Sequence, residues 1–182
     1  MAETFADPFK RRAKHGTLSW TLVALFIPAV LFPLGLWCLS DHPRFHWLCD
    51  IKEFPWELWI IATSGLAATV AGVADWRWHR SGRTAIGAPE HHDELLALLG
   101  GGLPLFGLMV WASFAPAPHF LLIPILLVAL FTVVLICHDE FVFHRKRCGR
   151  YETVLHRVLV FGNGTAWLAW MNWCFVRGGG HG

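Results

Sequence analysis

The chain has 182 residues, of which 55% are hydrophobic and only 15% are charged, and its mean hydropathy is +0.46. An ordinary soluble domain carries about 25% charged residues. This composition excludes a disordered chain and argues against a water-soluble domain. The formal net charge of +2 is too small to indicate a nucleic-acid partner. We therefore expect an integral membrane protein.

Five apolar runs divide the sequence. Each run is long enough to cross about 30 Å of hydrocarbon as a helix, and a helix satisfies the backbone of an isolated span. The sequence thus predicts an all-α membrane bundle with five transmembrane helices. The runs cover residues 17–39, 56–74, 95–115, 120–143 and 154–176, with a basic tail over 1–16, an external loop over 40–55, a four-helix unit over 56–176 that carries the functional site, and an external tail over 177–182.

The first run follows a basic segment, as the apolar part of a signal peptide does. It is too long for such a peptide and lacks a small-residue cleavage site, so we expect it to be a mature span. Kinks are expected where proline falls inside a run, because proline lacks the N–H of the helical hydrogen bond. These prolines are Pro28, Pro33, Pro104 and Pro124.

Basic residues predict the orientation of the spans. Most of the 15 lysines and arginines fall in the N-terminal tail and in the loops after the second and fourth runs. The positive-inside rule then places the N-terminus and these loops in the cytoplasm. We expect the membrane to be an inner or plasma membrane. Cys38 and Cys49 fall on the outer side, where they could pair as a disulfide. Most of the 11 tryptophans lie near span ends, whereas Trp167 and Trp170 are deeper and predict either packing or a wall around a cofactor.

Histidines and acids gather at the cytoplasmic ends of the second to fifth runs. Four pairs of them are spaced four residues apart, which puts both members of a pair on one helix face. Four helices that each offer such a pair could build a metal site in a bundle, and carboxylates with imidazoles suit iron, manganese or zinc. Snorkelling to the interface is the alternative explanation for any single residue. The pairs are Asp75 with His79, Glu90 with Glu94, Glu140 with His144, and Glu152 with His156.

The expected ligands divide into two groups. One group is expected to bind metal directly, and a second group competes for the remaining positions. Asp93 and Asp139 are expected behind the ligands or at the surface. The first group is Asp75, His79, Glu90, Glu140, His144, Glu152 and His156, and the second is Glu94, His91, His92 and His138.

A faint internal repeat relates the two halves of this cluster. The pattern is an acid, three residues, His-Arg, and then Gly, two residues, Glu and a further ligand, and it begins at Asp75 and again at Glu140. Two hairpins related by an approximate two-fold axis would pool their ligands, which suggests two metal ions rather than one.

The arrangement resembles that of membrane-bound non-haem diiron enzymes. Glu90-His91-His92 and His138-x5-His144 are similar to parts of the boxes of histidine-box hydroxylases and desaturases. Glu140-x3-His144 and Glu152-x3-His156 are similar to the Glu-x2-His ligands of alternative-oxidase-like carboxylate proteins, with one more intervening residue. The resemblance covers about residues 75 to 156 and implies oxygen activation at two iron ions.

The function expected is a dinuclear, oxygen-activating iron oxidoreductase of the hydroxylase, oxidase or desaturase type. Its substrate would be lipid-like or otherwise hydrophobic, bound at the cytoplasmic interface, and its electrons would come from a partner protein. Two alternatives remain open at this point. One is a zinc-dependent membrane hydrolase, and the other is a non-enzymatic subunit that binds haem or pigment within a larger membrane complex.

Overall fold

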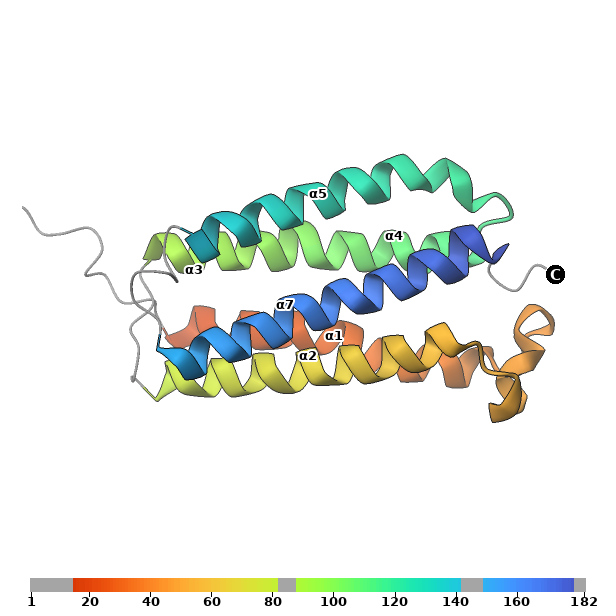
Figure 1. Ribbon diagram of the computed structural model, residues 1–182, viewed down its shortest axis with the longest axis horizontal. Coiled ribbons are helices and arrows are strands. Elements are labelled where there is room, and N and C mark those ends of the chain that lie inside the picture. Colours follow the sequence, from red (N-terminus) through yellow and green to blue (C-terminus); the bar gives the residue numbers. More distant parts are fainter. Residues whose placement is uncertain (1–14, 82–87, 142–148, 179–182) are drawn as a thin grey trace, which may run out of the picture.

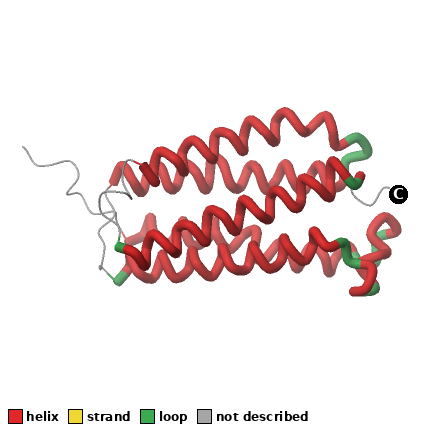
Figure 2. Tube along the Cα trace, viewed as in Figure 1, coloured by secondary structure: helices red, strands yellow, loops and turns green. Residues whose placement is uncertain are grey.

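In the computed structural model, the residues described are 15–81, 88–141 and 149–178. Over these ranges the chain forms helices joined by short loops, without a strand (Figure 1, Figure 2). The long helices run back and forth along a single axis. The all-α fold that the sequence predicts is therefore confirmed.

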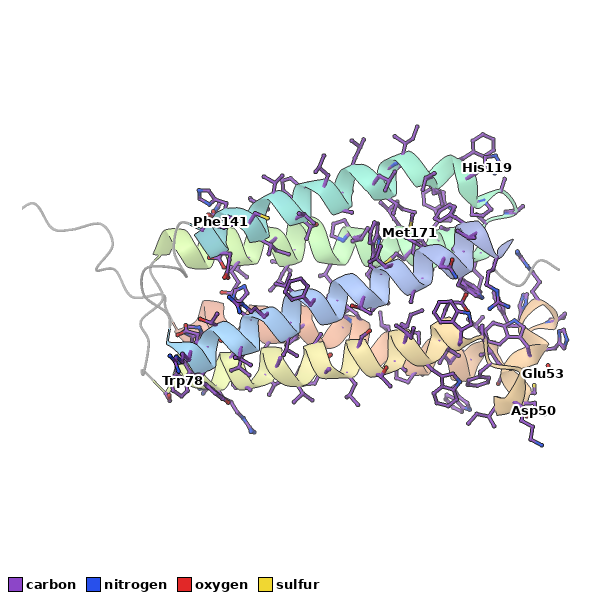
Figure 3. All side chains as sticks on the ribbon, in the orientation of Figure 1. Asp50, Glu53, Trp78, His119, Phe141 and Met171 are labelled. Carbon is purple, nitrogen blue, oxygen red and sulfur yellow. The ribbon has the colours of Figure 1, made fainter. Side chains whose placement is uncertain are left out.

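The helices follow one another as antiparallel rods. We call the end where α2 finishes and α3 begins the α2–α3 end, and the end where α4 finishes and α5 begins the α4–α5 end. Figure 3 shows Trp78 at the first of these and Asp50, Glu53 and His119 at the second. The elements are α1 (His15–Leu39), η2 (Pro43–Cys49), η3 (Ile51–Glu53), α2 (Trp56–Arg80), α3 (Ala88–Leu95), η4 (Leu96–Gly102), α4 (Leu103–Phe114), η5 (Pro118–Leu121), α5 (Leu122–Asp139), α7 (Arg150–Met171) and η7 (Asn172–Val176).

Four helical segments are long and apolar enough to cross a membrane: Leu22–Leu39, Trp56–Arg80, His92–Phe114 and Pro118–Asp139. They correspond to the first four predicted spans. The helix over the fifth, α7, has Arg157, Asn163 and Thr165 along its length, and these polar residues lower its hydropathy. A fifth span and the cytoplasmic N-terminus therefore stay predictions.

Large aromatic side chains are exposed around the α4–α5 end. Aromatic rings of this kind favour the boundary between hydrocarbon and water. Along α2, Trp59 near one end and Trp78 near the other are separated by about 28 Å at 1.5 Å per residue, close to the thickness of a bilayer core. The exposed rings at the α4–α5 end are those of Trp37, Trp56, Trp59, Trp111 and Phe120.

Small residues bring α2 and α7 together, and these two helices form the most extensive contact in the described chain. A Cβ atom on Gly162 would lie 2.8 Å from the backbone oxygen of Ser64 and 3.0 Å from Cβ of Ala68. Such close approach of backbones is a common way for membrane helices to pack. The contact fixes the faces that α2 and α7 turn toward each other.

The rod formed by α3, η4 and α4 contains a widened π-helical turn. Residues Leu96–Gly102 form the turn, and Pro104 follows it. Proline lacks an N–H and its ring crowds the preceding turn, which gives a local cause for the widening. Gly101 lies against α5 here, since a Cβ atom on it would meet the side chain of Thr132.

The larger apolar core lies toward the α4–α5 end, where α4, α5 and α7 meet. Trp170 is buried there with Ala112, Ile125 and Cys174. Its indole Nε1 donates to Oγ of Ser113 at 3.0 Å. Of the two roles predicted for Trp170, packing or a wall around a cofactor, the contacts support packing.

A buried acid, Glu57, lies at the start of α2 at the α4–α5 end. Its side chain is 0% exposed. Asn172 Nδ2 donates to Glu57 Oε1 at 2.8 Å, and Arg177 Nη1 donates to Oε2 at 2.9 Å. Both donors belong to the π-helical turn η7 or to the residue after it. Glu57 thus ties the beginning of α2 to the end of the α7 rod.

The loop predicted over 40–55 holds the two short helices η2 and η3. Phe45 and Leu48 of η2 are buried and pack with Leu58 of α2. Cys38 and Cys49 are free thiols rather than a disulfide. The Cys49 thiol instead donates to the backbone oxygen of Ser40 at 3.1 Å.

Candidate metal centre

The last turns of α2 supply the first two side chains of the site. Asp75 and His79 are four residues apart in a helix, and Asp75 Oδ2 lies 3.5 Å from His79 Nε2. Both side chains turn toward α7 and away from solvent. The predicted pairing of these two residues on one face is confirmed.

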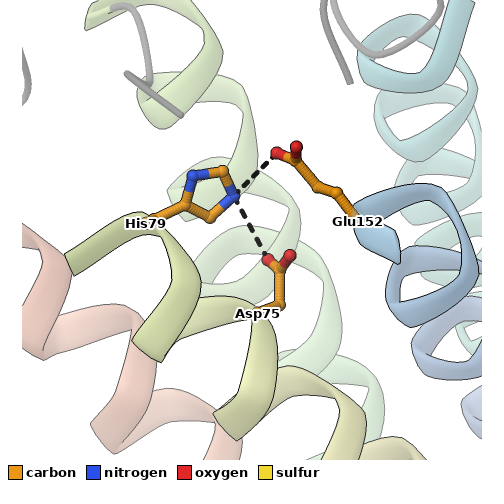
Figure 4. Close-up of side chains that lie close together, drawn as sticks. All are labelled: Asp75, His79 and Glu152. Carbon is orange, nitrogen blue, oxygen red and sulfur yellow. Dashed lines mark ion pairs between the residues drawn. The ribbon is translucent and has the colours of Figure 1, made fainter. Parts of the chain in front are cut away.

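The first turn of α7 supplies the third. Glu152 lies three residues after Gly149, whose extended backbone directly precedes the first residue of α7. Its carboxylate is 1% exposed, and Oε1 lies 3.2 Å from His79 Nε2 (Figure 4). A carboxylate in the first helical turn is favoured by the helix dipole. The ring of Tyr151 packs against Trp78 with centroids 4.9 Å apart, which holds the two helices in register.

Asp75, His79 and Glu152 form a group that could hold a metal ion. A ligand atom from each lies within 4.8 Å of the other two. Asp75 Oδ1 is also buried and has no hydrogen-bond partner among the described residues. A buried acceptor without a donor is costly in an apolar setting, and a cation would satisfy it. The donor set of one imidazole and two carboxylates fits iron, manganese or zinc.

A second pair lies on the adjoining turn of α7. His156 Nε2 is 3.6 Å from Asp139 Oδ2 at the end of α5. Glu152 and His156 are spaced four apart, so they share a helix face. Asp139 is buried, so the prediction that it lies at the surface is wrong, and its carboxylate lies beside the predicted ligand His156.

A third pair is more exposed. His138 Nδ1 of α5 lies 2.9 Å from Asp93 Oδ2 of α3. His92, next to Asp93, is strongly exposed, with Nδ1 3.6 Å from Asp93 Oδ1. His92 and His138 were expected to compete for ligand positions, but neither belongs to the group of three.

The remaining predicted ligands are not placed in this group. Glu140 follows Asp139 at the end of α5 and is partly exposed, and Glu94 is partly exposed in α3. Glu90 and His91 belong to α3, but their side chains lie outside the described part of the chain, as does all of His144. The pairs Glu90 with Glu94 and Glu140 with His144 therefore stay predictions.

Asp139 could have been found from helical spacing. It lies seven residues after Thr132, which faces Gly101, and fourteen after Ile125, which is fully buried. Residues seven apart share a helix face, so Asp139 continues the inward face of α5 and Glu140 turns away from it.

No known protein family, curated protein or solved structure matches this chain.

Proposed function

We propose that this protein is an integral membrane, metal-dependent oxidoreductase of the non-haem iron type. The observation that carries the proposal is the convergence of Asp75, His79 and Glu152, whose ligand atoms lie within 4.8 Å of one another between two helices. Burial of ionisable groups costs free energy unless they are paired or hold a cation, and all three side chains are largely buried. The four apolar helices support the membrane location.

The residues divide the work of holding the metal. His79 Nε2 faces both carboxylates, and its imidazole would supply the nitrogen ligand. The two carboxylates would neutralise the charge of a divalent cation, and their burial would limit access of water. His156 and Asp139 would hold a second ion, one turn further along α7. Bound iron supplies oxygen activation, which protein side chains alone cannot perform.

The substrate we propose is lipid-like or otherwise hydrophobic. The site lies at the level of Trp76, Trp78 and Tyr151 on the two helices, and such rings favour the membrane–water interface. A molecule dissolved in the bilayer would reach that level with its polar end. Electrons would come from a partner protein, and the side of the membrane would be the cytoplasmic one.

A zinc-dependent hydrolase is the second candidate. The observation that favours it is that a single group of three ligands is found among the described residues. Catalytic zinc takes three protein ligands and keeps one open position for water. A haem-binding subunit has less support, because His79 Nε2, the usual ligand atom for haem iron, faces two carboxylates.

The test is the metal content of detergent-purified protein, together with its absorption spectrum. We expect about two iron ions per chain in the wild type and loss of most of the metal in Glu152→Ala. Removal of a residue behind the ligands lowers metal affinity by about 10- to 100-fold, and removal of a ligand costs more. Glu53→Ala is the matched control, because Glu53 is an exposed acid at the α4–α5 end. Its metal content should equal that of the wild type.

Three other results would change the conclusion. One zinc ion per chain that Glu152→Ala loses would favour the hydrolase. A Soret band would favour the haem-binding subunit. Wild-type protein that binds neither metal nor chromophore would refute a metal centre, and the buried acids and histidines would then be structural.

A further inference from the structure

Histidines and carboxylates alternate from the surface of the α2–α3 end to the buried centre. The outermost are Asp93 of α3 and His138 of α5, joined at 2.9 Å. The His138 side chain is 52% exposed and that of Asp93 is 21% exposed. Helix α3 lies beside the end of α5 (Figure 1), so this pair bridges two helices at a place that solvent reaches.

The next pair inward is Asp139 with His156. Asp139 follows His138 directly along α5, and His156 lies 3.6 Å from it on α7. One turn back along α7 is Glu152, which contacts His79. The side chains of the outer pair are 52% and 21% exposed, those of His156 and Asp139 are 15% and 9% exposed, and those of His79 and Glu152 are 6% and 1% exposed. The pairs thus become more buried from the exposed outer pair to the centre.

We propose that Asp93 and His138 form a landing site for a divalent cation, from which the ion passes by Asp139 and His156 to Asp75, His79 and Glu152. The proposal rests on the proposed metal centre and adds how that centre is loaded. A hydrated cation holds its water tightly, and a buried site offers few paths by which that water can leave. Donors spaced along the way replace water one ligand at a time. The carboxylate at the surface raises the local cation concentration.

A landing site leaves a kinetic signature that differs from that of a ligand. Asp93 and His138 do not touch the bound ion, so they change the barrier to loading and not the stability of the loaded state. Their loss slows association and dissociation by the same factor and leaves the dissociation constant unchanged. Loss of a ligand instead weakens binding, mostly through faster dissociation.

The experiment measures Co²⁺ uptake by metal-free, full-length protein in detergent, followed by stopped-flow absorption. The variant is Asp93→Asn with His138→Gln. The control is Asp41→Asn with His119→Gln, an exposed acid and histidine at the α4–α5 end. We expect association and dissociation to slow by about tenfold in the variant, with the Co²⁺ stoichiometry and dissociation constant of the wild type. The control should load at the wild-type rate.

Two outcomes would overturn the landing site alone. One is a variant that loads as fast as the wild type, and the other is a variant with fewer Co²⁺ ions or weaker binding, which would make these residues ligands. A wild-type protein that takes up no Co²⁺ would refute the metal centre itself and the landing site with it. The failures of the two proposals are therefore distinguishable.

Discussion

Arg177→Met is expected to lower the free energy of unfolding by about 1–3 kcal/mol, the usual cost of leaving a buried polar group without its hydrogen-bond partner. The reason lies with the residue that remains. Glu57 is 0% exposed, whereas the Arg177 side chain is 50% exposed. Loss of the guanidinium leaves a buried carboxylate that still accepts from Asn172 Nδ2 but has lost its cation. The measurement is equilibrium unfolding of the purified protein in mixed micelles.

The unequal burial predicts an unequal pair of variants. Glu57→Gln keeps an acceptor for Asn172 and releases Arg177 to solvent, so it should cost less than Arg177→Met. The double variant Glu57→Gln with Arg177→Met should be more stable than Arg177→Met alone, because no charge is then left buried. Lys52→Met, which removes an exposed cation of η3, is the control and should have little effect. A double variant less stable than Arg177→Met would contradict this account of Glu57.

Gly162→Ala is expected to lower the free energy of unfolding by about 1–3 kcal/mol, the range for overpacking a close contact. The new Cβ would lie 2.8 Å from the backbone oxygen of Ser64, and a backbone atom cannot turn aside as a flexible side chain can. The helices α2 and α7 would have to move apart. Since the two helices share the site, the same unfolding measurement should be paired with the metal content.

Gly164→Ala is the matched control, two residues along the same helix. A Cβ atom there meets nothing within 4 Å among the described atoms. Alanine is a better helix former than glycine by about 0.5–1 kcal/mol, so Gly164→Ala should raise the free energy of unfolding. Opposite signs for the two substitutions are the expected result. A stabilising Gly162→Ala would show that the interface of α2 and α7 is looser than described.

The sequence predicts most of the fold because apolar length is a strong signal. The runs of apolar residues mark the helices that can cross a membrane, and all four candidate helices fall on predicted spans. Helix α7 shows the limit of this signal. Its Arg157 and Asn163 lower the hydropathy of a helix that packs along α2, so composition alone does not decide whether it crosses.

The candidate site was predictable in part, for a different reason. Spacing within one helix brought Asp75 and His79 together, and the first turn of α7 contributes Glu152 as expected. Contacts between helices have no such local signal. Glu57 pairs with Arg177 at a sequence separation of 120 residues, and no sequence pattern near either residue predicts the pair. Asp139 is intermediate, because its helical phase with Ile125 marks it as buried but does not identify His156 as its neighbour.

The spacing of tryptophans on α2 bears on how membrane thickness would affect the protein. About 28 Å of helix separates Trp59 from Trp78, and Asp75 and His79 lie beside Trp78. In a thicker, sterol-rich bilayer the protein would be too short, and each ångström of hydrophobic mismatch would cost a fraction of a kcal/mol. Either the lipids thin around α2, or the acid-bearing turn is drawn into hydrocarbon. Lipid chain length would thereby act directly on the carboxylates of the site.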